Sequence, residues 1–152
     1  MRRRLLVLLL LAALGAAAAV AATAGAKGAA KGGAATVALR RTKLGRILVD
    51  GSGRTLYLFM KDKHGKSACA GACAAGWPPL LTNGRPKAAH GVSQKLLGTT
   101  IRKSGRQVTY AGHPLYRYAG DSKAGQTNGE GSKAFGAAWY VLAPNGHKID
   151  KS

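Results

Sequence analysis

An internal repeat constrains the fold of this chain more than any other feature. The motif Tyr-x-aromatic-x-x-Asp occurs at Tyr57–Asp62 and, about 60 residues later, at Tyr116–Asp121. In both copies a Gly-Arg pair precedes the motif, a loop rich in Gly and Lys follows it, and a Trp comes after the loop. A lone hairpin is at best marginally stable in water, so two copies predict two halves that bury a face against each other. We therefore expect a single pseudo-twofold domain.

Short β-forming runs separated by glycine predict that both copies are built from hairpins. The 22 glycines among 152 residues favour many turns, and hence short strands rather than long helices. The strand pairs expected are 46–50 with 54–60, 107–110 with 113–118, 99–103 with 107–110, and 139–143 with 147–149 around the turn Asn145-Gly146. The predicted fold class is mainly β, with two related hairpin-based repeats at about 37–80 and 97–143 and a short helix around the Cys pair.

The first 26 residues are typical of a secretory signal peptide. Arg2–Arg4 form a positive start, Leu5–Leu14 an apolar core, and Ala24-Gly25-Ala26 a small-residue cleavage site. An uncleaved anchor is the alternative, but the second half of this uncharged run is mostly Ala and Gly and is therefore only weakly apolar. We expect residues 1–26 to direct export and then to be removed.

The remaining chain divides into a tether and a domain. Residues 27–35 contain only Gly, Ala and Lys, which predicts a flexible basic tether with nothing to bury. Residues 36–152 are then expected to form the single β-rich domain. Because no cysteine lies near the expected cleavage site, we expect a secreted or extracytoplasmic protein of the cell envelope that is not a lipidated lipoprotein.

The chain is strongly basic, with 24 Lys and Arg against five Asp and Glu, a formal net charge of +19. Long-range electrostatics attract such a protein to anionic envelope polymers or lipid headgroups in a salt-dependent way. Nucleic acid binds in a test tube for the same reason, but we expect none as a physiological partner of an exported protein. So few carboxylates leave little for acid–base chemistry that needs paired acids, and no hydrolase or haem-attachment motif occurs. We therefore expect no enzymatic activity.

Each copy supplies three aromatic residues and an acid that are candidates for core packing or for ligand binding. They are Tyr57, Phe59, Asp62 and Trp77 in the first copy, and Tyr116, Tyr118, Asp121 and Trp139 in the second. Core packing is the main prediction for the rings, because large aromatic side chains dominate protein interiors. The alternative is a platform on which a ligand stacks. We expect the two acids to cap turns at strand ends.

These motifs resemble those of a known family. The residues that carry the resemblance are the two Tyr-x-aromatic-x-x-Asp motifs, Cys69-x-Gly71-x-Cys73-Ala74, Trp77-Pro78-Pro79-Leu80, Leu96-Leu97-Gly98-Thr99 and Phe135-Gly136-x-x-Trp139-Tyr140-Val141. From about Val37 to Ile149 the chain resembles the bacterial secreted-repeat lipoproteins of unknown function. The resemblance implies an envelope or secreted location and no assigned activity. The chain departs from the commoner form of the family, since it lacks the lipidation cysteine.

Cys69 and Cys73 are the two cysteines of the chain, and we expect them to form a disulfide outside the cytoplasm. A short helix over residues 68–75, capped by Ser67 and ended by Gly76, would place both on one face with their Cα atoms about 6 Å apart. The main prediction is a local clip that pins the loop before Trp77. Because the closed loop is short, its stabilisation is modest, about 2 kcal/mol.

Two chemical alternatives remain open for the Cys pair. Met60 and His64 lie close in sequence, and together with Cys69 and Cys73 they form a candidate site for a soft metal such as Cu(I). The other alternative is a thiol–disulfide switch, although the C-x-x-C spacing of thioredoxin-like proteins is absent. The sequence therefore favours a non-enzymatic exported binding module, whose ligand is anionic or stacks on aromatic rings, over a redox or copper-handling protein. No cofactor besides copper is a candidate.

Overall fold

The computed structural model describes residues 32–151. The predicted signal peptide and most of the predicted tether lie outside the described residues. Residues 32–35 have no regular secondary structure, but Ala35 is joined to the domain: its N–H donates to Thr82 Oγ1 (3.0 Å) and its C=O accepts from Lys87 N (2.8 Å). Within residues 32–151, no helix has the length and apolar character needed to cross a bilayer.

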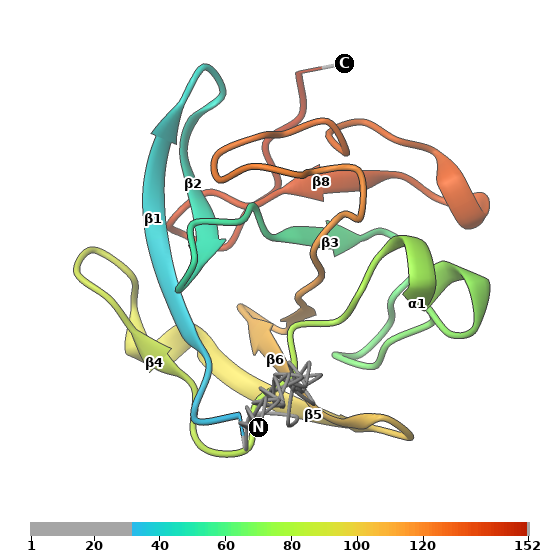
Figure 1. The fold of residues 1–152 in the computed structure, drawn as a ribbon, viewed down its shortest axis with the longest axis horizontal. Coiled ribbons are helices and arrows are strands. Elements are labelled where there is room, and N and C mark those ends of the chain that lie inside the picture. Colours follow the sequence, from blue (N-terminus) through green and yellow to red (C-terminus); the bar gives the residue numbers. More distant parts are fainter. Residues whose placement is uncertain (1–31, 152) are drawn as a thin grey trace, which may run out of the picture.

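The fold is mainly β, with one short α-helix near the Cys pair (Figure 1). Three small sheets have the strand orders β2-β1-β4, β3-β8 and β5-β6-β7. The elements are β1 Thr36–Thr42, β2 Gly45–Asp50, β3 Tyr57–Phe59, α1 Ala72–Gly76, β4 Lys87–Ala88, β5 Leu97–Arg102, β6 Gly105–Tyr110, β7 His113–Pro114 and β8 Trp139–Val141, with 3-10 turns at Gln94–Leu96 and Ala134–Gly136.

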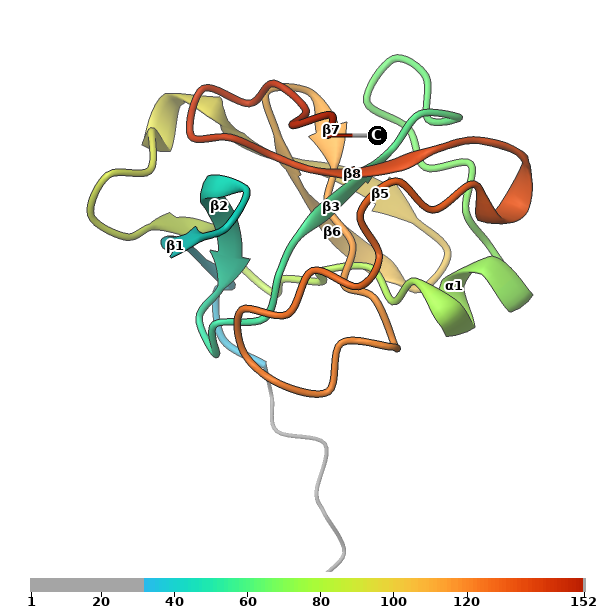
Figure 2. The same ribbon diagram turned by 90° about the horizontal axis from the view of Figure 1, so that it is seen from above.

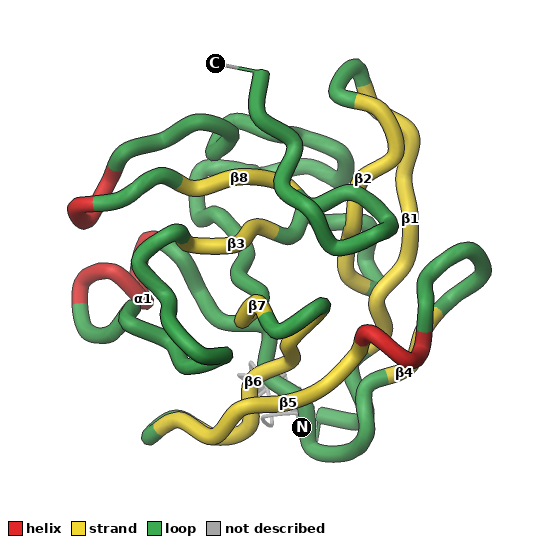
Figure 3. The backbone as a smooth tube through the Cα atoms, turned by 180° about the vertical axis from the view of Figure 1, so that it is seen from behind, coloured by secondary structure: helices red, strands yellow, loops and turns green. Residues whose placement is uncertain are grey.

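Two corresponding hairpins, β1–β2 and β5–β6, frame the molecule, and each turns at a glycine. Thr42 pairs with Gly45 in the first hairpin, and Arg102 pairs with Gly105 in the second. The φ angles of these glycines are +106° and +124°, in the region where a residue with a side chain is strained. Figures 1 and 2 show β3 and β8 side by side across the middle of the molecule, and Figure 3 shows the two hairpins from behind.

The backbone joins the two copies reciprocally at their motif tyrosines. Tyr57 N donates to Tyr116 O (2.8 Å), and Tyr116 N donates to Tyr57 O (3.0 Å). On its other side Tyr57 pairs with Val141 of the second copy, as Tyr116 pairs with Pro79 of the first. The pseudo-twofold axis therefore passes between the two tyrosines.

Each copy also completes the hairpin of the other. Leu48 N of β2 donates to Leu142 O, which follows β8 (2.9 Å). In the corresponding place Val108 N of β6 donates to Leu80 O of the first copy (2.8 Å). Because the last segment of each copy bonds to the hairpin of the other, neither copy forms a complete set of strands by itself. This exchange satisfies backbone groups that would otherwise be buried without partners.

The core has two parts, one on either face of β2 and β3. Ile47 and Val49 of β2 face one part and Leu48 faces the other, while in β3 Tyr57 and Phe59 oppose Leu58. The first part also contains Cys69, Cys73, Trp77, Tyr116, Trp139 and Val141, and the second contains Val37, Leu56, Leu80, Val108, Tyr110, Leu115 and Leu142. Strands apolar on both faces lie at the centre of a fold.

The first predicted hairpin, 46–50 with 54–60, exists only in part. Asp50 N donates to Arg54 O (2.8 Å) and Leu56 N donates to Leu48 O (3.1 Å), as expected for a hairpin. Beyond Leu56 the chain leaves β2 and pairs with β8 instead. The reason is that β3 is apolar on both faces, and the centre of the molecule buries both of them.

The pairing predicted between 107–110 and 113–118 also exists only in part, because β6 pairs with residues 113–115 and Tyr116 then pairs with Tyr57 and Pro79. The remaining predicted pairings are present, and one strand was missed. β5 pairs with β6 along its whole length, β6 pairs briefly with β7, and residues 141–149 form a hairpin in which Ala143 N donates to His147 O (2.9 Å). We did not predict β1, whose pairing with β2 mirrors that of β5 with β6. The adjacent Arg40 and Arg41 interrupt the alternation of polar and apolar residues that indicates a strand.

One ion pair ties β2 to the second copy. Arg117 Nε lies 2.5 Å from Asp50 Oδ2, and the other carboxylate oxygen accepts from the Ser52 N–H (2.9 Å), the Ser52 hydroxyl (2.7 Å) and Arg54 N (3.0 Å). Burial by itself raises the pKa of Asp50, but the hydrogen bonds from Ser52, Arg117 and Arg54 and the charge of Arg117 together hold that pKa below its ordinary value of 3.8. The folded state therefore keeps the carboxylate ionised.

We expect Asp50→Asn to lower the free energy of unfolding near neutral pH by about 1–3 kcal/mol, because it removes the charge that Arg117 pairs with. A depressed folded-state pKa stabilises the fold above the ordinary pKa, and this stabilisation is lost as pH falls through the folded value. Urea unfolding of both proteins should therefore show a gap near neutrality that shrinks well below pH 3.8. Arg117→Gln is the matched variant and should behave alike. A gap independent of pH would contradict this assignment.

Candidate functional site

The predicted site aromatics form one stack to which the two copies contribute alternately. The order is Phe59, Trp139, Trp77 and Tyr118. Trp77 and Trp139 stack with ring centroids 3.9 Å apart and an angle of 7° between planes. Phe59 stacks on the outer face of Trp139 (4.0 Å, 9°), and Tyr118 lies tilted against Trp77 (4.4 Å, 31°). Each ring in the series therefore contacts rings of the other copy.

Two tyrosines complete the cluster edge-on. Tyr57 meets Trp77 at 5.3 Å and 84°, and Tyr116 meets Trp139 at 5.1 Å and 86°, so the pseudo-twofold extends to ring geometry. These four rings and Phe59 are exposed by 2% or less. A buried ring has no face left for a ligand, so for these five residues the structure favours the core-packing interpretation over the stacking platform. Tyr118, at the end of the stack, is half-buried.

The motif acids cross between the copies, which the sequence did not predict. Tyr57 Oη donates to Asp121 Oδ2 (2.6 Å), and Tyr116 Oη donates to Asp62 Oδ2 (2.8 Å). The second oxygen of each acid accepts a backbone N–H from the loop that follows, at Ala68 for Asp62 (2.7 Å) and seven residues on for Asp121 (2.9 Å). The acids thus hold the loops that follow them, through amides six and seven residues on rather than by capping a turn at the strand end, and they also join the repeats.

Burial determines the protonation state of the two tyrosine hydroxyls in these contacts. It raises the pKa of Tyr57 and of Tyr116 far above the usual range for tyrosine, so both hydroxyls stay protonated and donate. Burial also raises the pKa of Asp62, against the opposing hydrogen bonds from Ala68 and Tyr116. The repeated Tyr and Asp therefore act as a structural lock between copies.

The predicted disulfide is present between Cys69 and Cys73, with Cα atoms 5.3 Å apart. The predicted helix is shorter than expected: α1 begins at Ala72 after Gly71, and Ser67 does not cap it. Instead Ser67 Oγ accepts from Cys69 N (3.2 Å). Cys69 lies outside the helix, which lets the two Cα atoms approach more closely than helical spacing allows.

The candidate soft-metal ligands are not gathered into one site. Both sulfur atoms are joined in the disulfide, so neither Cys69 nor Cys73 offers a thiolate, and both residues are buried. Met60 and His64 are exposed on the preceding loop. Among residues 32–151, no three His, Cys, Asp or Glu side chains are grouped so that they could hold a metal ion. Copper binding stays an untested prediction that would first require reduction of the disulfide.

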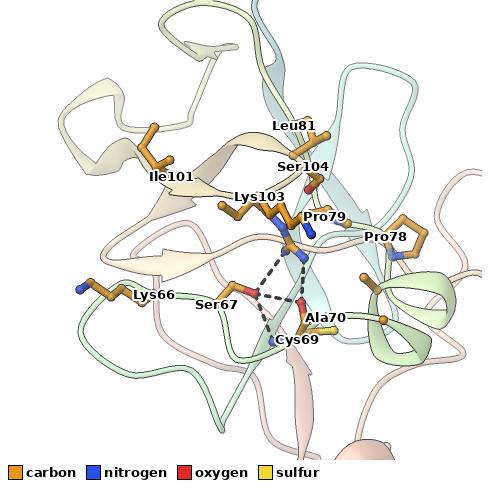
Figure 4. A pocket seen from close by; sticks show the side chains of 13 residues that line it. Lys66, Ser67, Cys69, Ala70, Pro78, Pro79, Leu81, Ile101, Lys103 and Ser104 are labelled. Carbon is orange, nitrogen blue, oxygen red and sulfur yellow. Dashed lines mark hydrogen bonds between the residues drawn. The ribbon is translucent and has the colours of Figure 1, made fainter.

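A cleft of about 820 Å³ opens beside the disulfide, and no sequence signal indicated it. We call it the disulfide cleft. It lies between the Cys loop of the first copy and the tip of the β5–β6 hairpin of the second. Figure 4 shows Lys66 and Ile101 on one side of it and Pro78 on the other. Its lining residues are Lys66, Ser67, Cys69, Ala70, Gly71, Ala74, Pro78, Pro79, Leu81, Ile101, Arg102, Lys103 and Ser104.

A second cleft, of about 500 Å³, occupies the corresponding place at the tip of the β1–β2 hairpin. We call it the cationic cleft. Residues 40–43, with the sequence Arg-Arg-Thr-Lys, line one side of it, and residues 124–127 of the other copy line the opposite side. The side chain of Arg40 lies against Gly53 and Gly125, where an added Cβ would come within 3.2 Å and 2.9 Å of it. Its lining contains no carboxylate.

The carboxylates of the protein are all engaged in structural contacts. Asp50 and Asp121 are buried, Asp62 is half-buried, and Glu130 Oε2 accepts from Val141 N (2.7 Å). The exposed Asp150 pairs with Lys148 (2.6 Å). By contrast, every Lys and Arg of residues 32–151 is exposed except the half-buried Arg54, Arg102 and Arg117. Apart from Asp150, the acids are thus buried or half-buried, while most of the bases are exposed.

We expect Tyr57→Phe to lower the free energy of unfolding by about 1–3 kcal/mol, because buried Asp121 would lose its hydroxyl donor. Tyr116→Phe should cost less, since Asp62 is only half-buried and water can replace the donor. Tyr118→Phe is the control, because its hydroxyl makes no hydrogen bond to another of the residues described. Denaturant unfolding measures all three. A loss for Tyr118→Phe as large as for Tyr57→Phe would contradict the lock.

A scan of protein-family models matches residues 38–81 and 98–143 to a family described as a secreted repeat of unknown function. The search of curated proteins and the search of solved structures each find no match. The two matched segments coincide with the halves that exchange strands, rings and acid–tyrosine contacts about the pseudo-twofold axis. They cover more than half of the chain, and the chain therefore belongs to the family of secreted repeats of unknown function, of which it carries two copies.

Proposed function

We propose that this protein is a non-enzymatic, exported binding module for anionic ligands of the cell envelope. The observation that carries the proposal is the partition of its charges. The formal net charge is +19, and the few carboxylates are taken up in buried or paired contacts. A surface of one sign raises the local concentration of ligands of the other sign and speeds their association.

The burial of the aromatic cluster narrows the ligand class. A stacking ligand needs an exposed ring, and the Trp–Trp stack has both outer faces covered by Phe59 and Tyr118. An anionic ligand needs only the exposed bases. The anionic class is therefore the one we propose, with envelope polymers and lipid headgroups as the partners of suitable charge.

The absence of enzymatic activity is also part of the proposal. A general acid or base must reach its substrate, and Asp62 and Asp121 are committed to tyrosines and to backbone amides. The pKa of Tyr57 and of Tyr116 is raised by burial, which suits a donor in a structural contact rather than a group that exchanges protons.

We expect the exported protein to sediment with vesicles of mixed phosphatidylglycerol and phosphatidylcholine and to dissociate from them as the salt concentration is raised. It should not sediment with vesicles of pure phosphatidylcholine. The triple variant Arg40→Gln/Arg41→Gln/Lys43→Gln removes three bases that line the cationic cleft. It should weaken binding more than Lys61→Gln/Lys63→Gln/Lys133→Gln, a triple variant of equal charge whose positions lie outside both clefts. Each base near an anionic surface contributes roughly 1 kcal/mol, so the first triple variant should lose tenfold or more. Binding that resists salt, or equal loss in both triple variants, would contradict a localised anion site.

The second candidate function is redox or copper handling through Cys69 and Cys73. The disulfide itself favours this candidate. However, Cys69 is only 1% exposed and Cys73 only 6%, so their sulfur atoms are shielded from an attacking thiolate. We expect Cys69→Ser/Cys73→Ser to lose about 2 kcal/mol of stability and to keep vesicle binding, because the clip closes only a short loop. Urea unfolding and the same sedimentation assay measure both. Loss of ligand binding by a variant that remains folded would favour the redox candidate.

A further inference from the structure

We propose that the disulfide cleft binds the chain of an anionic amphiphile, a single alkyl or acyl chain ending in a phosphate, sulfate or carboxylate group. This inference rests on the proposed function for the sign of the ligand's charge, and it adds a second site, which has an apolar part and is separate from the cationic cleft. A volume of about 820 Å³ is within the range of small-molecule sites.

The walls of the cleft supply the apolar half of the site. Large apolar side chains with high exposure are few in the described part of the chain: Met60, Leu81, Ile101 and Phe135. Leu81, at 41% exposed, and Ile101, at 75%, both line the disulfide cleft. Between them and helix α1 lie Pro78 and Pro79 (Figure 4). An apolar chain laid there would remove these surfaces from water.

Arg102 supplies the charged half. Its Nη1 donates to Ser67 Oγ (3.2 Å) and Gln107 Oε1 (2.9 Å), and its Nη2 donates to Cys69 O (2.7 Å). All three acceptors are neutral, so these bonds fix the guanidinium without neutralising it. Nε and the second Nη2 hydrogen make no bond to another of residues 32–151. A guanidinium with two N–H groups to spare is suited to a phosphate or carboxylate.

No carboxylate of the described residues competes for this guanidinium. Asp62 is close enough for Arg102 to lower its pKa, but burial outweighs that effect, and the Asp62 oxygens already accept from Tyr116 and Ala68. No ion pair forms between Asp62 and Arg102. The exposed Lys66 and Lys103 add positive charge at the rim. The lining of the cleft therefore contains basic side chains and no carboxylate.

Comparison of the two clefts distinguishes an amphiphile from a simple anion. When the repeats are aligned on Gly45 and Gly105, Ile101 corresponds to Arg41 of the cationic cleft. A simple anion suits the cationic cleft, but in the disulfide cleft it would leave Ile101 and Leu81 in water. An uncharged chain would cover them but would place apolar atoms against an unpaired guanidinium, which is costly. A chain with an anionic end satisfies both.

The test is titration of the exported protein with decyl phosphate below its micelle concentration, followed by calorimetry. Inorganic phosphate, decanol and decyltrimethylammonium are the comparison ligands. We expect decyl phosphate to bind at least tenfold more tightly than each of the three. Equal binding of decyltrimethylammonium would overturn the charge argument, and equal binding of inorganic phosphate would overturn the apolar argument.

Variants locate the site. Ile101→Ser, at an exposed position, should weaken decyl phosphate binding at least fivefold without changing the unfolding midpoint, whereas Phe135→Ser, exposed by 45% and outside the cleft, should leave binding unchanged. Arg102→Gln should weaken decyl phosphate and leave decanol unchanged, and Lys103→Gln gives a smaller change of the same kind if Arg102→Gln unfolds. The assignment of the site to the disulfide cleft would be overturned if Ile101→Ser bound decyl phosphate fully, or if Arg41→Gln lost decyl phosphate binding instead. Vesicle binding by Ile101→Ser reports separately on the proposed function, because this variant leaves every base of the protein in place.

Discussion

The structure depends on reciprocal completion of two similar halves. Tyr57 and Tyr116 exchange backbone hydrogen bonds across the pseudo-twofold axis, and around them the strands, rings and acids of each copy find their partners in the other. A repeat of this size cannot bury both faces of its own central strand, so exchange is the means by which such short strands become a core. The Trp77–Trp139 stack is the centre of that arrangement because each ring covers the other.

The same exchange shapes the surface. Three of the five carboxylates are engaged in contacts between the copies: Asp62 and Asp121 with the tyrosines of the opposite copy, and Asp50 with Arg117. The bases remain outside. The clefts lie where the loop of one copy approaches the hairpin tip of the other, so they too result from the way the two copies complete each other, although their linings differ.

Much of the fold was predictable because its signals are local or repeated. The β5–β6 pairing, the hairpin at Asn145-Gly146, the disulfide and the repeat itself follow from alternation, turn residues, spacing and self-similarity. Strand β1 was missed because Arg40 and Arg41 break its alternation. The first two hairpins were predicted too long, since nothing within residues 54–60 or 113–118 indicates that a segment of the other copy is a better partner than the preceding strand.

The sequence by itself determined that the protein is a basic chain of two related β repeats with a local disulfide, because composition, periodicity and spacing carry that information. Only the tertiary structure decided which tyrosine meets which acid, that the aromatic rings pack on one another, and that Ile101, Leu81 and Arg102 line one cleft with the Cys loop. These are contacts between residues far apart in the chain. Their energy depends on burial and mutual orientation, which a linear pattern does not record.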